Sequence, residues 1–480
     1  MMTLRDLLMD CTAPDVAVSG MTLDSRSVRS GDVFIALPGA KCDGREFIDQ
    51  AFERGACAAL VETAVGFAAM DDRVLPVECL RKQLGALVDR FYDSPSKHLK
   101  LLAATGTNGK TSVVELTAQL LRNMEQQAGV IGTLGMRLDH APTDTANTTP
   151  DCIALHRQLT AWREQSVGWV AMEASSHALD QGRLDGLSVD AAVFTNLSRD
   201  HLDYHPSMEA YFDAKLKLFQ EFDPAVQLYN ADDPLLAERS AVWADGGLGI
   251  SCNGLNTPVQ VAVSGLSPLV FDLRTPWGAA HITSSLTGRF NAFNLTAALC
   301  LLAATGVPFS ELTTAAPQVQ PILGRLQRLQ HAADITVLID YAHTPDALER
   351  TLSTLSEGEV SGRIWVLFGC GGDRDRGKRA EMGAVAARLA DHVVVTSDNP
   401  RTESPDDIIR DIVAGCDHAS LCVEPDRAAA IGLAVSQAST GDLVLIAGKG
   451  HEAYQEIDGK RHPFSDAEHA CRHLDLRLAA

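Results

Sequence analysis

A candidate phosphate-binding loop reads Thr105-Gly106-Thr107-Asn108-Gly109-Lys110-Thr111-Ser112. Glycines let the backbone turn its N–H groups toward a polyphosphate, and the amino end of a following helix adds a favourable dipole. Lys110 can reach the β- and γ-phosphates of a nucleotide, and the hydroxyl of Thr111 can bind Mg²⁺. The usual pattern begins with glycine where this chain has Ala104, so a glycine-rich turn with an incidental lysine is the alternative. An apolar run before the loop and a helical pattern after it favour the nucleotide site.

A nucleotide site by itself fits a kinase, a GTPase, a motor or a ligase. The sequence contains no Asn-Lys-x-Asp guanine signature, which disfavours a GTPase. Other loops must therefore decide among the remaining classes.

Titratable residues follow two other apolar runs. Glu173 comes directly after Trp169–Met172, and a loop from Asn196 to His205 that contains His201 follows Ala191–Thr195. A carboxylate at a strand end beside a phosphate loop is well placed for Mg²⁺, which prefers oxygen ligands. A lone histidine is more often a structural or surface residue. Because Glu173 and His201 both lie at predicted strand ends, we expect metal or phosphate chemistry.

Two lysines, Lys215 and Lys217, lie on a predicted helix over residues 211–219. Positions two residues apart on a helix point to different faces. The pattern predicts that both lysines are solvated, and it singles out neither of them for chemistry.

These loops must be positioned by parallel sheets. Short apolar runs alternate with amphipathic helical patterns, which is typical of α/β proteins, and such sheets place ligands in the loops after strand ends. The predicted strands are Asp32–Leu37, Cys57–Val61, Leu99–Ala104, Trp169–Met172, Ala191–Thr195, Ile335–Ile339, Ile364–Phe368, His392–Thr396 and Leu443–Ala447, with helices over Arg45–Arg54 and from near Val113.

The chain has 480 residues, which is too long for one ordinary core, so we expect two to four domains. A polar turn, Asp93-Ser94-Pro95-Ser96, closes a first block, and a third block opens after Pro321–Leu326. These breaks predict domains at residues 1–97, 98–324 and 325–480.

Composition excludes several classes of protein. The formal net charge of −21 argues against nucleic acid, although a local cluster of Arg and Lys can still bind a small anion. The amino terminus shows no signal-peptide pattern, and the apolar run Leu295–Gly306 is too short to span a bilayer and predicts a buried helix. The 11 cysteines form no CxxC pairs, which predicts reduced, mostly buried thiols in a cytoplasmic protein.

Taken together, the motifs resemble those of the Mur ligases, which add amino acids stepwise to the peptidoglycan precursor. They span nearly the whole chain in order: Thr105–Ser112, Met172–Leu179, Asn196–His205, Ala214-Lys215, Gly288–Asn291, Leu323–Arg325, Asp340–Pro345, Gly369–Lys378, Asp398–Arg401 and Gly448–Glu452. The resemblance implies three domains: a UDP-substrate-binding domain, a central P-loop ATP-binding domain with a parallel sheet, and a Rossmann-like amino-acid-binding domain. It also implies a monomer.

The resemblance assigns roles that pattern cannot. Lys215 matches a lysine that CO₂ carbamylates in this family, which converts a cation into a carboxylate-like anion. With Thr111, Glu173 and His201 it would bind Mg²⁺ at two sites, beside the catalytic Lys110. The ATP site would include the phosphate loop from Gly106 to Ser112 and further residues at Asn291, Asn294, Arg325, Asp340 and His343.

The resemblance also places the UDP-sugar substrate, UDP-MurNAc-L-Ala-D-Glu. An arginine is physically sensible in such a site because the substrate carries a diphosphate and free carboxylates. A structural helix-capping role is a serious alternative for Ser175. The matching residues are Leu23, Ser25, Ala40, Lys41, Cys42, Asn147, Thr148, Thr149, Ser175, Gln181 and Arg183.

The tetrapeptide Asp398-Asn399-Pro400-Arg401 resembles the members that add meso-diaminopimelate and differs from those that add L-lysine. Diaminopimelate carries a second carboxylate at its far end, which Arg401 can bind through two hydrogen bonds. With lysine bound, the guanidinium would be left without a partner in a desolvated pocket. Arg374 would be the second guanidinium, while Glu452 would pair with the distal ammonium and Gly448 would offer its carbonyl. A turn-stabilising ion pair is the alternative for Arg401.

The predicted reaction starts with attack of the D-glutamyl γ-carboxylate on the γ-phosphate of ATP. The resulting acyl phosphate reacts with the amine of diaminopimelate, whose proton passes to His201 or to a substrate group. One rival is another ligase of the superfamily, such as folylpolyglutamate synthase, and Asp398–Arg401 argues against it. The other is a nucleotide-binding regulator, for which Glu173, His201 and Lys215 would have no use.

Overall fold

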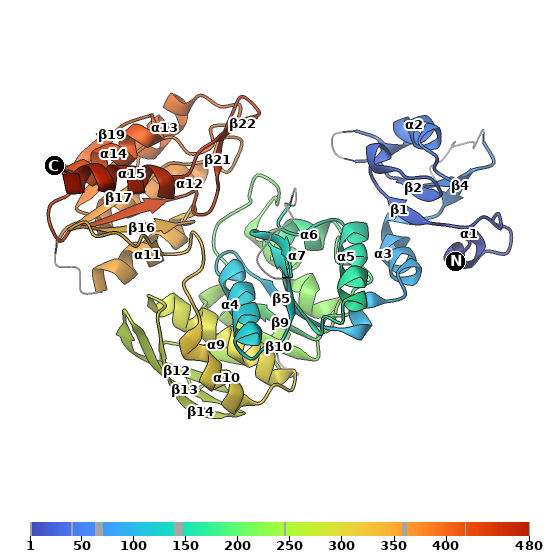
Figure 1. Cartoon of the computed structure of the whole chain (residues 1–480), viewed down its shortest axis with the longest axis horizontal. Helices are drawn as coiled ribbons and strands as arrows, with labels where there is room; N and C mark the ends of the chain where they lie inside the picture. Colours follow the sequence, from blue (N-terminus) through green and yellow to red (C-terminus); the bar gives the residue numbers. More distant parts are fainter. Residues whose placement is uncertain are drawn as a thin grey trace. The chain divides into compact units, whose positions relative to one another are not determined.

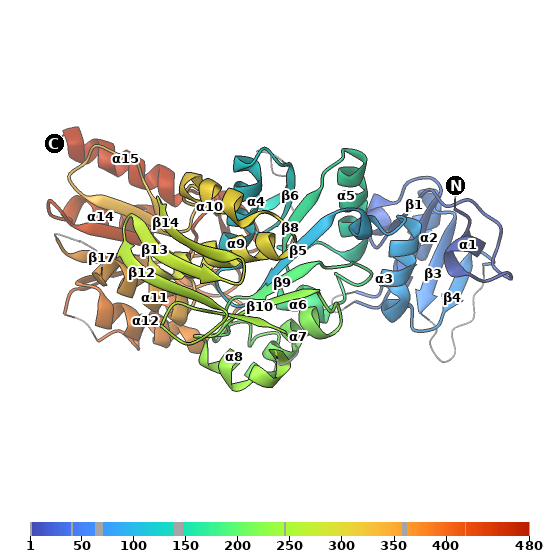
Figure 2. The ribbon, with the colours of Figure 1, turned by 90° about the horizontal axis from the view of Figure 1, so that it is seen from below.

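The computed structural model describes residues 2–39, 42–62, 71–138, 147–243, 246–357, 362–417 and 419–479 and shows an α/β protein (Figures 1 and 2). The chain forms two compact units. The first comprises Met1–Ala103, Gln127–Asp190 and Ala214–Ala225, and the second comprises Ala104–Gln126, Ala191–Asp213 and Val226–Ala480. Within the described ranges, no helix combines the length and the apolar character needed to cross a membrane.

The first unit begins with a four-stranded parallel sheet in the order β1-β2-β3-β4. The residues of β2 alternate between two cores, with Val33 and Ile35 facing one and Phe34 and Ala36 facing the other. Both faces are therefore covered, which explains why β2 is apolar throughout. The elements are α1 (Leu4–Leu8), β1 (Gly20–Thr22), β2 (Asp32–Ala36), α2 (Ile48–Glu53), β3 (Ala58–Glu62), β4 (Val74–Val77) and α3 (Leu80–Phe91).

A helix expected over Arg45–Arg54 is divided in the structure. A 3-10 turn, η2 (Gly44–Phe47), is followed by the short helix α2. Asp43 caps η2, since its carboxylate accepts the N–H of Arg45 at 3.0 Å. The expected helix therefore lies at the expected position, but its first half is a 3-10 helix and not an α-helix.

The first unit also contains a run of strands in the order β5-β8-β6-β7. β6 pairs with β8 in parallel and with β7 in antiparallel orientation. A Cβ added to Gly129 would lie 2.6 Å from the ring of Trp162, so helix α5 packs directly on the sheet. The elements are β5 (Lys100–Thr105), β6 (Ala128–Gly132), β7 (Gly135–Arg137), α5 (Cys152–Glu164), β8 (Trp169–Glu173) and α6 (Ser176–Asp180).

The second unit opens with helix α4 (Lys110–Asn123) and a run of strands in the order β14-β13-β12-β11-β10-β9. Pairing is parallel from β9 to β12 and antiparallel from β12 to β14, as the ribbons in Figure 2 show. The strands are β9 (Ala191–Phe194), β10 (Val226–Asn230), β11 (Leu248–Ser251), β12 (Val259–Leu266), β13 (Leu269–Thr275) and β14 (Gly278–Ser284).

Four further helices accompany these strands. They are α7 (Met208–Gln220), which runs from the second unit into the first, α8 (Pro234–Glu238), α9 (Arg289–Ala304) and α10 (Phe309–Ala315). α9 is buried along nearly its whole length and packs against α4, which confirms the prediction of a buried helix at its apolar run.

The carboxyl-terminal part of the second unit is a six-stranded sheet in the order β15-β16-β20-β17-β18-β19. All neighbouring strands are parallel except the pair β15 and β16. The strands are β15 (Gln327–Arg328), β16 (Thr336–Asp340), β17 (Ile364–Phe368), β18 (His392–Val395), β19 (Leu421–Val423) and β20 (Leu443–Ala447), and a hairpin of β21 (Tyr454–Ile457) and β22 (Lys460–Pro463) follows.

Helices cover both faces of this six-stranded sheet (Figure 1). One core contains apolar residues of α11 (Pro345–Glu357), α12 (Gly377–Leu389) and α13 (Pro405–Val413). The other contains residues of α14 (Arg427–Gln437) and α15 (Asp466–Ala479). The arrangement matches the Rossmann-like sheet that the sequence predicts.

The nine predicted strands all occur, with bounds that differ by at most one residue. Helix α4 is a correction, because it begins at Lys110 and not near Val113. Gly109 ends the phosphate loop in the left-handed region (φ 89°), so the helix starts on the next residue. The cysteines are a second correction. Cys11, Cys42 and Cys79 are exposed, although all eleven thiols are free.

Candidate functional site

The phosphate loop connects β5 to α4 in the way that the sequence predicts. Gly106 has a φ of 141°, and a Cβ added there would overlap the hydroxyl oxygen of Thr195. Lys110 is the first residue of α4, and its ammonium donates to the carbonyl oxygens of Gly106 (2.8 Å) and Thr107 (2.9 Å). Phosphate oxygens can replace these carbonyls as acceptors, so the loop fits a nucleotide.

The segment after β9 holds the phosphate loop in place. The carbonyl oxygen of Asn196 accepts the N–H of Thr107, and its side-chain oxygen accepts the N–H of Asn108, both at 2.9 Å. Its side-chain nitrogen donates to the carbonyl of Asn108 at 2.9 Å. The sequence interpretation gave Asn196 no role of its own, although an asparagine directly after a strand end was an available signal.

Thr111 and Ser112 are buried in the first turn of α4. The Thr111 hydroxyl accepts a hydrogen bond from Nη2 of Arg325 at 2.9 Å. The guanidinium of Arg325 also lies 4.5 Å from the ring centroid of Tyr341, and its buried Nε finds no acceptor among the described residues. A buried donor without a partner is costly, which suits a ligand atom at this place.

Asn291 and Asn294 lie in the first turns of α9 and touch each other, with Nδ2 of Asn294 3.2 Å from Oδ1 of Asn291. Asn294 also reaches the phosphate loop, since its Oδ1 lies 2.9 Å from a Cβ built on Gly109. Asn291 and Arg325 both line a cavity of about 460 Å³. The structure thus brings the predicted nucleotide residues together in the second unit.

Asp340 and His343 follow the end of β16. Both oxygens of Asp340 accept backbone N–H groups, from Leu326 at 2.6 Å and from Ala342 at 2.8 Å. Burial raises the pKa of Asp340. The carboxylate therefore fixes the segment that carries Arg325. His343 bonds through Nδ1 with the carbonyl of Tyr341 at 2.8 Å.

Asp200 and Lys378 are site residues that the sequence interpretation passed over. Asp200 is buried beside His201, and its carboxylate lies 3.6 Å from the ammonium of Lys378 and 3.7 Å from Nε2 of His343. Burial alone would raise the pKa of Asp200, but Lys378 and the two histidines hold it well below the usual range. The sequence did contain a feature that could have identified Asp200, because this residue lies in the loop that is densest in titratable groups.

Glu173 ends β8 in the first unit and is buried. Its carboxylate accepts the N–H of Thr133 at 2.7 Å and the Thr133 hydroxyl at 3.2 Å. Gly132 leaves room for it, since an added Cβ would overlap Oε1 of Glu173. Thr133 was not found from the sequence.

Lys215 corrects the expectation that both lysines of α7 are solvated. Its side chain is 1% exposed, whereas that of Lys217 is 32% exposed and lies 3.5 Å from Asp180. The two lysines do lie on different faces of α7, and the face that carries Lys215 is packed against other parts of the protein. Across the described ranges, no cluster of three or more His, Cys, Asp or Glu side chains could hold a metal ion.

The predicted sugar-peptide residues Thr148, Thr149, Ser175, Gln181 and Arg183 gather in the first unit, where Asn147 directly precedes them in the chain. Arg183 donates to the carbonyl of Thr149 (2.7 Å) and to the side-chain oxygen of Gln181 (2.6 Å). The Thr149 hydroxyl lies 3.4 Å from that of Ser175, and Thr148 accepts from Thr133 at 3.3 Å.

Ser175 caps helix α6, because its hydroxyl accepts the N–H of Ala178 at 3.3 Å. The capping role weighed for this residue is therefore confirmed. In the amino-terminal sheet, Ser25 donates to Gln50 at 2.6 Å, Leu23 packs against the core and Cys42 is exposed. The predicted residues Ala40 and Lys41 lie outside the described residues.

Arg401 and Arg374 both lie against Gly371. A Cβ built on Gly371 would be 2.8 Å from Nη1 of Arg401 and 3.7 Å from Cγ of Arg374. Arg401 donates to the carbonyl of Gly372 at 2.7 Å, and its Nε lies 3.5 Å from Glu456. The ion-pair alternative for Arg401 thus has a partner in Glu456, although the long distance leaves the guanidinium available to a carboxylate.

The segments Asp398–Arg401 and Gly448–Glu452 lie against each other. Nδ2 of Asn399 donates to Oε2 of Glu452 at 2.8 Å. Gly448 has a φ of 110°, and a Cβ there would lie 2.7 Å from Oδ2 of Asp398, so the two strand-end loops approach closely. Pro400 contacts a third segment, Gly369–Lys378, because a Cβ on Gly372 would overlap the carbonyl oxygen of Pro400.

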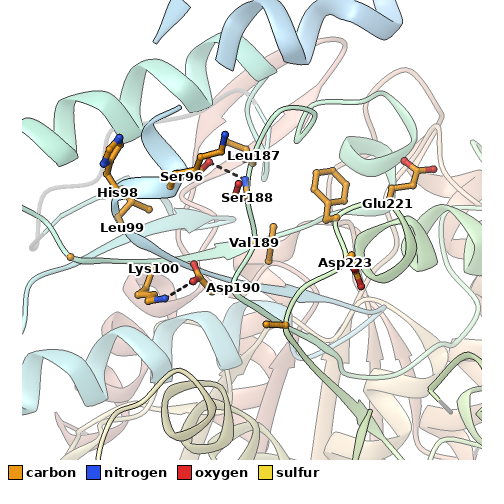
Figure 3. A pocket seen from close by; sticks show the side chains of 14 residues that line it. Ser96, His98, Leu99, Lys100, Leu187, Ser188, Val189, Asp190, Glu221 and Asp223 are labelled. Atoms are coloured by element: carbon orange, nitrogen blue, oxygen red, sulfur yellow. Dashed lines mark hydrogen bonds and ion pairs between the residues drawn. The ribbon is translucent and has the colours of Figure 1, made fainter. Parts of the chain in front are cut away.

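A larger cavity of about 710 Å³ lies apart from all of these residues, in the first unit (Figure 3). Its lining includes residues at the amino ends of strands, namely Lys100, which begins β5, and Gly168 and Asp190, which precede β8 and β9, and Lys100 pairs with Asp190 at 2.7 Å. Open α/β sheets bind ligands at the opposite, carboxyl ends of their strands. This cavity is therefore not the active site.

The chain matches three family descriptions in order. They are the Mur ligase family, catalytic domain, over residues 17–92, the Mur ligase middle domain over 104–302, and the Mur ligase, glutamate ligase domain, over 324–450. The chain belongs to the Mur ligase family. The middle-domain match contains the phosphate loop, and the glutamate-ligase match contains Arg401 and ends two residues before Glu452.

Several relatives of this Mur ligase carry the name UDP-N-acetylmuramoyl-L-alanyl-D-glutamate--2,6-diaminopimelate ligase. The protein of that name from Chromobacterium violaceum is 46% identical over 92% of this chain and 91% of its own. The one from Pseudomonas aeruginosa is 45% identical over 96% of each chain. A solved structure of the same name superposes with a TM-score of 0.70 at 36% identity and covers 99% of both chains.

Proposed function

We propose that this Mur ligase uses ATP to join meso-diaminopimelate to the D-glutamyl residue of UDP-MurNAc-L-Ala-D-Glu. The relatives with the matching name align over more than nine-tenths of both chains. The observation that carries the choice of amino acid is a group of side chains in which Arg401 and Arg374 flank Gly371 while Asn399 holds Glu452. Two guanidiniums and one carboxylate complement a molecule with two carboxylates and a second ammonium.

The residues of the chain suggest how the reaction proceeds. The amino end of α4 and Lys110 bind the phosphates of ATP, and Arg325 and Asn291 lie where the rest of the nucleotide would bind. The substrate γ-carboxylate attacks the γ-phosphorus of ATP, and the bond from that phosphorus to the β-phosphate oxygen breaks. ADP departs, and the substrate is now an acyl phosphate. The neutral amine of diaminopimelate attacks the acyl carbon, phosphate leaves with the bonding electrons, and the amine loses its proton.

We further propose that Lys215 is carbamylated by CO₂ and that its carbamate, Thr111, Glu173 and His201 bind Mg²⁺ at two sites. The burial of Lys215 supports this, since a buried cation is costly and a carbamate turns it into an oxygen donor. The hydroxyl and carboxylate donors suit a hard cation. When bound, Mg²⁺ neutralises charge on the phosphates and the attacking carboxylate.

The functional division into residues 1–97, 98–324 and 325–480 is part of this proposal. The family matches support it, because the first ends at residue 92 and the others begin at residues 104 and 324. The monomeric state and the cytoplasmic location expected from the sequence stay predictions.

The proposal is tested by phosphate release from the purified protein with ATP, Mg²⁺ and UDP-MurNAc-L-Ala-D-Glu. One set of reactions receives meso-diaminopimelate and a matched set receives L-lysine, with added bicarbonate in both. We expect turnover with diaminopimelate at least about 10²-fold above that with lysine, because lysine has no distal carboxylate to bind the half-buried guanidinium of Arg401. Equal turnover would overturn the choice of amino acid, and absence of turnover with both would overturn the proposed reaction.

A further inference from the structure

Lys449 is a buried cation to which neither the sequence nor the proposed reaction gives a role. It follows β20 in the carboxyl-terminal sheet, and its side chain is 0% exposed. Its ammonium donates to Oδ1 of Asn399 and to Oε2 of Glu452, both at 3.0 Å. A buried lysine is costly unless it is paired and hydrogen-bonded, and here both partners belong to the proposed amino-acid site.

The contacts of Asn399 fix the direction of its amide. Oδ1 accepts from Lys449 and also from the N–H of Glu456 at 3.0 Å, so two donors require the oxygen on this side. The nitrogen must then face Glu452, to which it donates at 2.8 Å. Without Lys449 one of the two donors is lost, and the amide has less reason to keep this orientation.

The carboxylate of Glu452 is held by one oxygen. Oε2 accepts from both Asn399 and Lys449. In the part of the chain that the structure describes, no donor bonds to Oε1, and the Glu452 side chain is 17% exposed. One oxygen is thus fixed by the protein, and the other is available to a cation of a ligand.

We propose that Lys449 is a positioning residue for recognition of the second ammonium group of the amino-acid substrate. It ties the Asp398–Arg401 segment to the Gly448–Glu452 segment and leaves Oε1 of Glu452 for the distal ammonium. This inference rests on the proposed function and deepens it, because it separates selection for the distal ammonium from selection for the distal carboxylate by Arg401. A merely structural lysine would not make that distinction.

The test compares meso-diaminopimelate with L-2-aminopimelate, which keeps the distal carboxylate and lacks the distal ammonium. Steady-state kinetics are measured for the wild type, Lys449→Met, Lys449→Gln, Glu452→Gln and the double variant Lys449→Met/Glu452→Gln. Lys460→Met is the matched control, since Lys460 is an exposed lysine on β22 of the same hairpin region. Thermal melting and ADP binding by each variant report whether it is folded.

We expect Lys449→Met to raise the KM for meso-diaminopimelate by about 10- to 100-fold, the range for a lost charged hydrogen bond. The KM values for ATP and for L-2-aminopimelate should change less than about threefold, so the preference between the two amino acids largely disappears. The double variant should be no worse than Glu452→Gln alone, because Lys449 acts through Glu452. Lys460→Met should behave as the wild type.

Two results would overturn the inference. One is an equal rise in KM for both amino acids, and the other is additive effects of the two single substitutions. If Lys449→Met does not fold, Lys449→Gln, which still offers a hydrogen-bond donor, takes its place. The ratio of its KM values for meso-diaminopimelate and L-2-aminopimelate is then compared with that of the wild type. A wild type without turnover on meso-diaminopimelate would overturn the proposed function and this inference together, whereas a wild type that turns over normally confines any failure to Lys449.

Discussion

The phosphate loop and the proposed amino-acid site lie in the same unit and are built in different ways. The loop is one continuous segment, and Lys110 is the first residue of the helix that follows it. The proposed amino-acid site is assembled from three segments that are far apart in the sequence and meet through Arg401, Asn399 and Glu452. The comparison shows that the loop is organised by local backbone geometry, whereas the proposed amino-acid site is held together by long-range side-chain contacts.

Gly106→Ala gives the largest expected effect on the loop side. The φ of 141° is unfavourable for alanine, and the new Cβ would overlap the Thr195 hydroxyl, so the loop must move. We expect kcat/KM to fall by about 10²–10³-fold with every amino acid, as for the loss of an organised anion site. Phosphate release and ADP binding measure it, with Gly168→Ala as a control for an exposed glycine whose Cβ would meet open space. A loss confined to diaminopimelate would contradict the comparison.

Arg401→Met should affect the proposed amino-acid site and not the phosphate loop. It removes the guanidinium that lies against Gly371 and bonds to the carbonyl of Gly372, and we expect the KM for diaminopimelate to rise by about 10²-fold. The KM for ATP should stay within about twofold of the wild type. Arg410→Met, which removes an exposed arginine of α13, serves as the control. An equal rise in both KM values would show that the two regions are not separable.

Arg199 connects the two regions. It belongs to the segment that holds the phosphate loop, and its guanidinium donates to both oxygens of Asp375 (2.9 and 3.2 Å) and to Glu381 (3.2 Å). Because such partly exposed pairs contribute little, we expect Arg199→Ala to lower kcat/KM only about two- to fivefold. Both KM values should shift by the same factor, which titration of each substrate would reveal. A shift in one value alone would show that Arg199 belongs to a single region.

His451 also lies between the regions, 5.3 Å from the ring centroid of Tyr341 and next to Glu452. Burial lowers the pKa of His451 to about 4, and Arg325 and Lys449 add to the effect. The unfolded chain binds a proton there more readily, so this stability is present above pH 6.5 and is lost as the pH falls toward 4. The loss is at most about 3 kcal/mol.

Melting temperatures between pH 7 and pH 4 test this for the wild type, His451→Gln and the exposed control His462→Gln. The slope of melting temperature against pH should be shallower in His451→Gln, and unchanged in the control. Equal slopes in all three proteins would show that His451 titrates as an ordinary histidine.

The sequence predicted the parts of the site that are local. Strand ends, the phosphate loop and Glu173 follow from apolar runs and the residues after them. Lys215 was misjudged, because a pattern of polar and apolar residues cannot show which of two helix faces a distant segment covers. Asp200, Lys378 and Lys449 were missed for the same reason, since each has a partner that lies tens to hundreds of residues away. Family resemblance supplied candidate residues but not these supporting contacts.

Two glycines close the gap between the nucleotide and amino-acid segments. Gly324 has a φ of 67°, and a Cβ there would overlap the backbone nitrogen of His451, while one on Gly450 would lie 2.8 Å from the carbonyl oxygen of Gly324. The main chains before Arg325 and before Glu452 therefore touch without any side chain between them. Such segments open to solvent as one unit, so the amide hydrogen of His451 should exchange more slowly once nucleotide binds, even before any amino acid is present.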